Sequence, residues 1–271
     1  MERAAVKLSK MTIPEGIKLS KGTFMILEEG KMGVVYLIAS GKGGTGKSMF
    51  AINFGAILAM RKKSVVIVDM DMGLRNIDLY MGLENNVIFD VHDVMSGVCQ
   101  ISQALIKDDR FESLYIMGAS PVKEDGSITP LHTRVLCEKL KEVFDYVIID
   151  SPSGIDDGLV IASGGADACV IVTTPEIASV RNADMLDREL VRIGLDRRYV
   201  VVNKVSVKLM KSGYNLGISE INSRLSPELA GIIQSDDNIN ISTNLGVPIV
   251  LKPGTYIRKN FERIADQLLE E

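Results

Sequence analysis

The sequence predicts an α/β fold: a doubly wound, mainly parallel β-sheet with helices on both faces. Several short runs consist almost entirely of apolar residues, as strands do when both faces of a parallel sheet are covered. Segments long enough to be helices separate most of these runs, so strands and helices alternate along the chain. This alternation is typical of parallel sheets built from right-handed crossovers, whose ligands bind beyond the carboxyl ends of the strands.

The composition fits a soluble globular protein. Of the 271 residues, 46% are hydrophobic and 24% are charged, which allows a large core. The net charge of −4 gives no general attraction to nucleic acid or to an anionic membrane. The three cysteines are widely spaced and form no C-x-x-C pair, so they suit a reduced cytoplasm. No apolar run approaches the ~18 residues of a membrane span, and the N-terminus lacks the apolar region of a signal peptide.

We expect an N-terminal extension over residues 1–32 and a single domain over residues 33–271. In the extension Pro14-Glu15-Gly16 marks a turn, and residues 17–27 could form a short strand pair. The extension is either a loosely docked segment or an arm for targeting or partner binding. No low-complexity linker divides the remainder.

The elements of the domain follow in order. The expected strands cover residues 34–38, 64–69, 114–117, 146–150, 168–173, 199–203, 229–233 and 247–250, and the expected helices cover 47–60, 134–144, 179–194 and 255–271. The last helix has apolar residues at positions i, i+4, i+7, i+8, i+11 and i+12, which predicts a helix that covers the core rather than a membrane helix. Its end is acidic, with no Lys or Arg after Arg263, so we expect no membrane binding there. Any membrane attachment would come through residues 1–32 or through a partner.

A glycine-rich loop joins the first strand to the first helix. Gly41, Gly46, Lys47 and Ser48 form the pattern G-x-x-x-x-G-K-[ST] of a phosphate-binding P-loop. Between a strand and a helix, backbone N–H groups and the helix N-terminus both face a phosphate, whereas a simple turn rarely needs these residues in this register. We therefore predict that the chain binds a nucleoside triphosphate. The contacts are expected from Gly43, Gly44, Thr45, Gly46, Lys47, Ser48 and Met49.

Polar residues at three strand ends are expected to gather beside this loop. Asp69, Asp150 and Asn203 each end a predicted strand. Asp150 is either an acid on the Mg²⁺ side of the phosphates or a cap of the next turn, and the P-loop favours the first. The hydroxyl of Ser48 is a hard oxygen ligand of the kind that Mg²⁺ prefers. Lys47 would supply a point charge to the β- and γ-phosphates.

The loop Lys42-Gly43-Gly44-Thr45-Gly46-Lys47-Ser48 carries a second lysine that an ordinary P-loop does not require. In this form it resembles the deviant P-loop of the MinD/ParA family of ATPases, and the resemblance extends over residues 33 to 270. In that family the extra lysine reaches the partner's phosphates across a dimer interface. The resemblance therefore implies ATP and Mg²⁺ as cofactors, an ATP-dependent homodimer, and slow hydrolysis that dimerisation or a partner stimulates. Lys42 and Lys47 are then catalytic as well as phosphate-binding.

Further stretches favour the MinD branch. Residues 69–82 resemble its first switch, which implies that Asp71 positions the attacking water beside the metal site formed with Ser48 and Asp150. Residues 150–154 read Asp-Ser-Pro-Ser-Gly and resemble its second switch. Asn203 resembles the family's adenine-contacting asparagine, but residues 233–236 lack the proline of the second adenine contact. Residues 174–184 resemble the family's partner-binding helix, and the alternative is that their exposed polar residues are only a solvated face.

The resemblance implies an ATP-dependent switch that regulates division-site placement. Its expected location is the cytoplasm, either free or peripheral at the inner face of the cell membrane. A flagellar-number regulator or a ParA-type partition ATPase shares the motifs. The partition role would need a basic surface for DNA, and eight basic against eight acidic residues follow from Lys204 onward. An iron–sulfur carrier would need suitably placed cysteines, and a related tyrosine kinase a Tyr-rich tail. A protein of another class, a scaffold that holds ATP without hydrolysis, stays an alternative.

Overall fold

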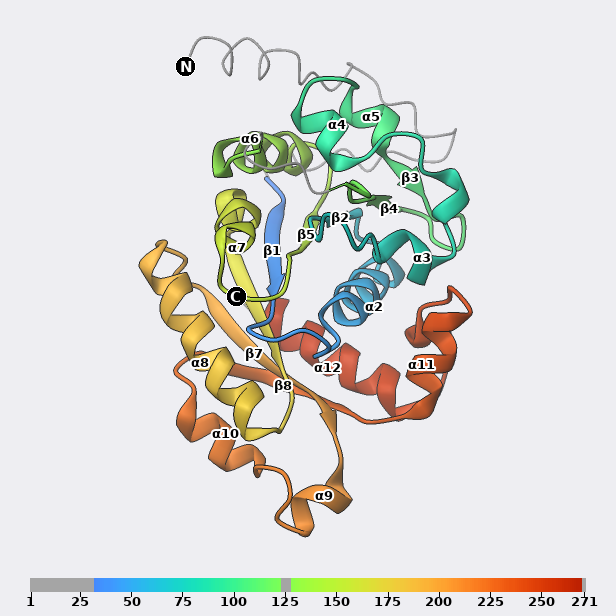
Figure 1. Ribbon diagram of the computed structural model, residues 1–271. Helices are drawn as coiled ribbons and strands as arrows, with labels where there is room; N and C mark the ends of the chain where they lie inside the picture. The colour runs from blue at the N-terminus through green and yellow to red at the C-terminus, as the bar shows by residue number, and fades with distance from the viewer. Residues whose placement is uncertain (1–31, 123–127, 270–271) are drawn as a thin grey trace.

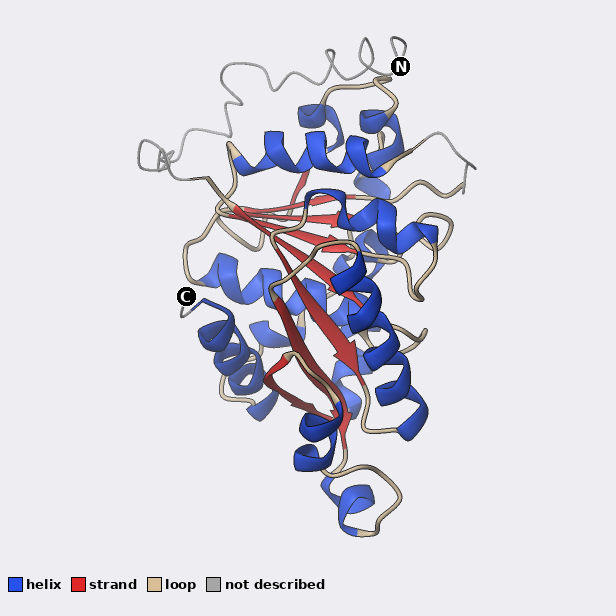
Figure 2. Cartoon of the chain, turned by 90° about the vertical axis from the view of Figure 1, so that its left-hand side faces the viewer, coloured by secondary structure: helices blue, strands red, loops and turns tan. Residues whose placement is uncertain are grey.

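The computed structural model describes residues 32–122 and 128–269, and these residues form an eight-stranded sheet with helices on both sides (Figures 1 and 2). The strands run in the order β3-β4-β2-β5-β1-β6-β7-β8, and every neighbouring pair is parallel except β3 and β4. The strands are β1 (Val34–Ala39), β2 (Val65–Asp69), β3 (Ile106–Lys107), β4 (Leu114–Met117), β5 (Tyr146–Asp150), β6 (Ala168–Thr173), β7 (Arg198–Val205) and β8 (Glu228–Gln234). The predicted fold class is confirmed.

The helices connect these strands. They are α2 (Lys47–Met60), α3 (Ile77–Met81), α4 (Val91–Met95), α5 (Ile101–Ala104), α6 (Pro130–Lys141), α7 (Asp157–Ala162), α8 (Ile177–Arg192), α9 (Val207–Lys211), α10 (Ile218–Arg224), α11 (Asp237–Asn244) and α12 (Tyr256–Leu269), with 3₁₀ turns η1 (Glu84–Asn86), η2 (Ser163–Gly165) and η3 (Ile249–Leu251). None of the described helices is long and apolar enough to cross a membrane.

Each face of the sheet has its own hydrophobic core, because successive side chains of a strand point to opposite faces. In β1, Val35 and Leu37 join the core under α4 to α8 and α10, whereas Tyr36 and Ile38 join the core under α2, α3 and α12. All four side chains are almost completely buried. This two-sided burial explains why the central strands are apolar without alternation, and it fixes β1 and the loop that follows it at the centre of the sheet (Figure 1).

Helix α12 covers the core as predicted. Ile257, Phe261 and Leu268 are fully or almost fully buried, and the Phe261 ring stacks on Phe50 of α2 with centroids 5.7 Å apart. The Tyr36 hydroxyl donates a 2.7 Å hydrogen bond to the carbonyl of Leu268. The apolar face of this helix is therefore already occupied by the fold.

The structure corrects one predicted strand. Residues 247–250 do not pair with the sheet; instead Ile249–Leu251 form a 3₁₀ turn. Pro248 precedes this turn and has no N–H to donate to a ladder. The amide of Val250 donates to Asn53 Oδ1 of α2 at 3.2 Å, which satisfies the backbone while Ile249 and Val250 stay buried. The apolar run reflected burial, which a turn can provide as well as a strand.

Smaller differences concern boundaries and edges. The helix predicted over 134–144 is α6, which begins earlier with Pro130 as its first residue and ends at Lys141. The two-residue antiparallel strand β3 was not predicted, because it is too short to show a pattern. The possible strand pair at 17–27 lies outside the described residues, so the division of the chain at residue 32 stays a prediction.

Candidate nucleotide-binding site

The glycine loop connects β1 to α2 and lines a cavity of about 460 Å³ beyond the carboxyl ends of the strands. Gly44 and Gly46 have φ angles of 77° and 92°, which favour glycine. A Cβ on Gly46 would also lie 2.2 Å from Asn203 Nδ2. Both the backbone conformation and this close approach therefore require glycine at position 46. Gly43 to Met49, from which the phosphate contacts are expected, all line the cavity. The other lining residues are Asp71, Leu74, Asn76, Tyr80, Ser153, Asn203, Lys204, Ser235, Asp236, Asp237, Ile239, Asn240 and Thr243.

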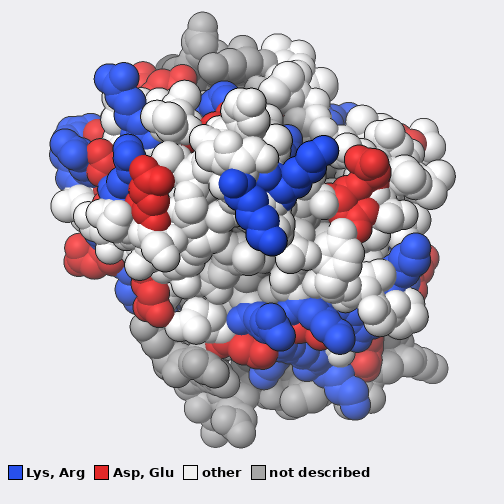
Figure 3. All heavy atoms as spheres, turned by 90° about the horizontal axis from the view of Figure 1, so that it is seen from below, with Lys and Arg blue, Asp and Glu red and all other residues white. Residues whose placement is uncertain are grey.

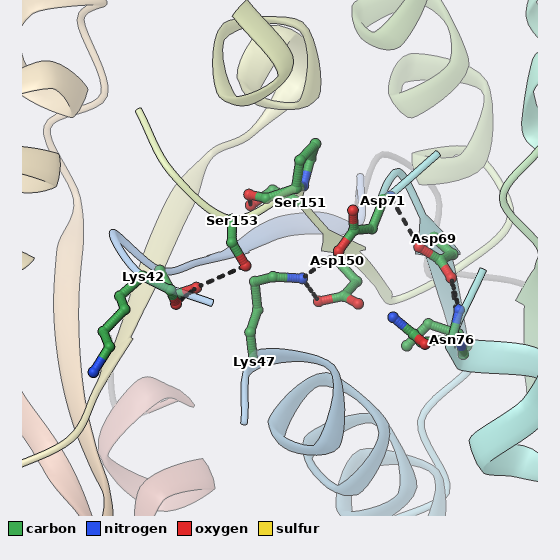
Figure 4. Close-up of polar contacts among 11 residues, drawn as sticks. Lys42, Lys47, Asp69, Asp71, Asn76, Asp150, Ser151 and Ser153 are labelled. Carbon is green, nitrogen blue, oxygen red and sulfur yellow. Dashed lines mark hydrogen bonds and ion pairs between the residues drawn. The ribbon is translucent and has the colours of Figure 1, made fainter. Parts of the chain in front are cut away.

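Lys47 is held between two carboxylates at the start of α2 (Figure 4). Its ammonium lies 2.7 Å from Asp150 Oδ1 and 3.8 Å from Asp71 Oδ2, and only 4% of the side chain is exposed. Parallel pairing of β2 and β5 sets Asp150 beside Asp69, so both strands end in an acid at the same level of the sheet. The predicted gathering of strand-end acids beside the loop is therefore observed.

The donor set fits a hard divalent cation. Asp150 Oδ2 is buried and has no hydrogen-bond partner among the described residues, so one oxygen of this carboxylate is unsatisfied within the protein. Ser48 and Asp71 carry oxygens on the cavity wall, and Asp150, which is not itself a lining residue, contacts the lining residue Lys47. The described residues contain no group of three or more His, Cys, Asp or Glu that could form a metal cage. Mg²⁺ is usually bound by a few protein oxygens, and phosphate oxygens and water complete its coordination shell.

Asp69 is a structural residue of the site to which the sequence analysis gave no role. Its carboxylate accepts backbone N–H bonds from Asp71 at 2.9 Å and from Asn76 and Ile77 at 3.1 Å (Figure 4). These bonds fold the segment 70–76 over the end of β2 and thereby place Asp71 on the cavity wall. Burial, and then the neighbouring Asp150, raise the pKa of Asp69 to about 7 despite these hydrogen bonds. The feature of the sequence that could have identified Asp69 as a site residue is its position at the end of a predicted strand.

Lys42 points away from the cavity (Figure 4). Its ammonium lies 2.9 Å from Glu176 Oε2, just before α8, and 44% of its side chain is exposed. It is absent from the residues that line the cavity. The two lysines of the loop therefore lie in different places: Lys47 lines the cavity, and Lys42 lies on the surface outside it.

Another part of the cavity wall is formed by residues at the end of β7, by residues that follow β8 and by α11. Asn203 is buried beside the loop, and Ser235, Asp236 and Asp237 follow β8. Asp236 caps α11 through the amide of Asn238 at 2.8 Å and accepts a bond from the Tyr256 hydroxyl. The sequence analysis marked residues 233–236 as a second base contact without its proline, but it did not identify α11 as a wall.

Comparison with known proteins identifies the family. A ParA family model described as NUBPL iron-transfer P-loop NTPase matches residues 31–269. The chain belongs to the ParA family of P-loop NTPases. It is 42% identical over 245 residues to the septum site-determining protein MinD of Bacillus subtilis (strain 168), across 89% of this chain and 90% of that protein. It is 34% identical over 242 residues to the septum site-determining protein MinD of Thermotoga maritima, across 89% of each.

Solved structures agree with this placement within the ParA family. The MinC:MinD cell division protein complex of Aquifex aeolicus matches with a TM-score of 0.81 and 34% identity, across 88% of this chain and 97% of that chain. The cell division ATPase MinD of Pyrococcus furiosus matches with a TM-score of 0.79 and 26% identity, across 88% and 99%. The chain is thus a MinD-like member of the family, as the two switch stretches predicted.

The cysteines do not support the iron-transfer description of the family model. Cys99, Cys137 and Cys169 are buried in the core, and burial raises the pKa of each thiol. A thiolate is the form that binds iron or a cluster, and these environments disfavour it. The ParA-family character of this chain therefore lies in its nucleotide site.

Proposed function

We propose that the protein is an ATP-dependent, dimerising ATPase that regulates the placement of the division site, as the MinD proteins it resembles do. The observation that carries this proposal is the opposite placement of the two lysines in one glycine loop. Lys47 is buried against Asp150 inside the cavity, whereas Lys42 is exposed outside it. This difference supports a role for Lys47 at the nucleotide of its own subunit and a role for Lys42 at the nucleotide of a partner subunit.

The cavity suits the phosphates of ATP. Backbone N–H groups of Gly43 to Ser48 and the ammonium of Lys47 offset the charge of the triphosphate. Magnesium, held by Ser48, Asp150 and the phosphates, with Asp71 nearby, would neutralise the charge that develops on the transferred group. Asp71 would orient the attacking water, and Asp69 fixes the backbone that carries Asp71.

Hydrolysis would require the dimer. Phosphoryl transfer depends on positioning and charge, and a cation supplied by a partner subunit is worth roughly 10³–10⁵ in rate. Lys42 is the exposed cation of the loop, and its ion pair with Glu176 is of the surface kind that contributes about 0–1 kcal/mol. Turning Lys42 toward a second subunit therefore costs little.

The partner site is proposed on residues Pro175–Asp184, at the start of α8. Ile177 is 65% exposed there, more than the other exposed apolar side chains of α8, Met185 at 43% and Val191 at 49%. The segment also touches the glycine loop, because a Cβ on Gly41 would lie 2.3 Å from the carbonyl of Asn182. A protein bound to α8 would thus contact a helix that packs against the glycine loop.

Other roles of the family are less well supported. On the face seen from below, Lys and Arg side chains form separate groups rather than the continuous basic stripe expected for DNA binding, and Asp and Glu lie beside the groups at the edges of the view but not beside the central one (Figure 3). We place the protein in the cytoplasm, with any membrane contact made outside α12, whose apolar face is buried. A flagellar-number regulator would share this nucleotide site, and the location of a fluorescent fusion at septum, pole or nucleoid distinguishes these roles.

Phosphate release with Mg²⁺ and ATP, measured over a range of protein concentrations, tests the enzymatic proposal. We expect slow turnover whose rate per subunit rises with concentration, accompanied by a doubling of mass in light scattering. A protein that binds ATP and dimerises but releases no phosphate would instead be a non-hydrolysing scaffold.

A further inference from the structure

One arginine links the ends of α3 and α11, two helices that pack against each other (Figure 1). Arg110, in the loop between β3 and β4, donates from Nη2 to the carbonyl of Met81 at 2.7 Å. It also donates from Nη1 to the carbonyl of Gly246 at 2.7 Å. Met81 is the last residue of α3, and Gly246 follows α11 by two residues. Carbonyls at the C-terminal end of a helix lack partners within the helix and carry partial negative charge, so a guanidinium suits this place.

Asp108 holds the guanidinium in position. Nε of Arg110 lies 2.8 Å from Oδ1 and Nη2 lies 2.6 Å from Oδ2, so the two groups form a bidentate pair. Asp108 is 1% exposed, and its amide donates to the carbonyl of Leu114 in β4 at 2.9 Å. A lysine presents its donors from one nitrogen and cannot hold a bidentate pair and two separate carbonyls together. The planar guanidinium therefore fastens both helix ends to β4.

Two glycines bring the same helix ends into direct contact. Gly82, which ends α3, and Gly246 have φ angles of 67° and 66°. A Cβ on Gly246 would lie 2.7 Å from Cα of Gly82, which is closer than such atoms approach one another. The two backbones thus touch at the carbonyls that Arg110 holds, and they leave no space for a side chain between them.

Both helices line the nucleotide cavity, so the distance between them affects its width. Tyr80 of α3 is a lining residue, and so are Asn240 and Thr243 of α11. Arg110 is absent from the residues that line the cavity. It therefore acts on the cavity through the two helices and not by touching a ligand.

The part of the cavity lined by α11 suits a nucleoside better than phosphates. Asp236 and Asp237, at the start of α11, are lining residues whose carboxylates repel phosphates. The phosphates are expected at the glycine loop beside Lys47, which attracts them. The base and ribose of a bound nucleotide are then left for the part of the cavity whose walls include α11.

We infer that Arg110 is a positioning residue that holds α3 and α11 at the separation a nucleoside requires, so that it supports binding of the nucleoside and not of the phosphates. Its hydrogen bonds go to Asp108, Met81 and Gly246. The glycine loop and Lys47 are not among these partners, so the phosphate contacts do not depend on it directly. This inference rests on the proposed ATP binding.

Arg110→Lys tests the inference, because lysine keeps a cation beside the buried Asp108 and avoids the cost of an unpaired carboxylate. Calorimetry with Mg²⁺ would compare ATP with tripolyphosphate, which has no nucleoside, after denaturant unfolding has shown that the variant is folded. We expect the variant to bind ATP about three- to tenfold more weakly and tripolyphosphate as the wild type does.

The other outcomes are distinct. Equal weakening of both ligands would mean that Arg110 supports the fold in general, and unchanged binding of ATP would mean that the helices keep their separation without it. Either result overturns the inference. A wild type that binds neither ligand would instead refute the proposed function itself.

Gly246→Ala provides a second measurement in which Arg110 is intact, because the added methyl group forces α11 away from Gly82. Gly213→Ala is the matched control, since Gly213 has a φ angle of 75° and no neighbouring atom within 4 Å of an added Cβ. The two variants share the strain of a positive φ, and only the first moves the helices. We expect Gly246→Ala to weaken ATP binding about three- to tenfold relative to Gly213→Ala, with tripolyphosphate binding unchanged. Equal ATP binding by the two variants would show that the contact between the helix ends does not set the fit of the nucleoside.

Discussion

The inner and outer ends of the glycine loop each place a lysine against a carboxylate, but the two ion pairs differ in what surrounds them. At the inner end Lys47 and Asp150 are 4% and 0% exposed and 2.7 Å apart. At the outer end Lys42 and Glu176 are 44% and 55% exposed and 2.9 Å apart. Removing one partner of a buried pair costs about 3–5 kcal/mol, whereas an exposed pair contributes about 0–1 kcal/mol. Nearly equal distances thus describe one fixed charge and one that is readily released.

Lys47→Ala should have the largest effect. The variant loses the phosphate-binding charge and leaves Asp150 buried without its cation, so ATP binding should be abolished and the unfolding free energy should fall by about 3–5 kcal/mol. Calorimetry and denaturant unfolding measure the two losses. Lys139→Ala is a matched control, because Lys139 forms an exposed ion pair with Glu142 at 2.8 Å. A Lys47→Ala chain that binds ATP normally would show that the inner end is not the phosphate site.

The difference between the two ends explains what the sequence could predict. The positions of Lys47 and Ser48 at the start of a helix follow from the local geometry of a strand, a glycine turn and a helix. The position of Asp150 beside Lys47 follows because parallel strands bring their ends together. Partners from distant elements were not predicted. These partners depend on how β7, β8 and α8 pack around the loop. They are Glu176 against Lys42, the hydrogen bond from Lys204 to the carbonyl of Gly44, and the cavity wall formed by α11. The 3₁₀ turn at Ile249–Leu251 was missed for the same reason, since its burial comes from α2.

Lys42→Ala should preserve ATP binding and abolish catalysis. Because Lys42 lies outside the cavity, its removal leaves the phosphate contacts of the same subunit intact. Loss of a cation supplied to the partner would slow hydrolysis by roughly 10³–10⁵ and should prevent the ATP-dependent dimer. Light scattering and phosphate release measure both, again with Lys139→Ala as the control. Normal dimerisation and turnover would make the outer pair an ordinary surface ion pair.

Asp71→Ala should separate binding from hydrolysis at the inner end. Asp71 lies 3.8 Å from the Lys47 ammonium and does not replace Asp150 as its close partner. The variant should therefore bind ATP, form the dimer and stay in it, with turnover lowered by about 10²–10⁴, as for loss of a positioned group in proton transfer. Size-exclusion chromatography with ATP, together with phosphate release, would detect the trapped dimer. Rapid turnover would assign the water-positioning role to another acid.

The smallest expected effect is the dependence of stability on pH at Asp69, which also belongs to the inner end. The pKa of Asp69 is raised from 3.8 to about 7, by burial first and then by Asp150. The folded chain therefore keeps a proton that the unfolded chain loses near pH 4, and this stabilisation is present at low pH and is lost as the pH rises toward 7. One pKa unit corresponds to about 1.4 kcal/mol, and because the shift is shared with Asp150 we expect a decline of about 2 kcal/mol. The difference in unfolding free energy between the wild type and Asp69→Asn isolates this group. It should fall between pH 4 and 7 and be level above pH 8, and a difference that rises over that range would mean that the carboxylate is stabilised in its charged form.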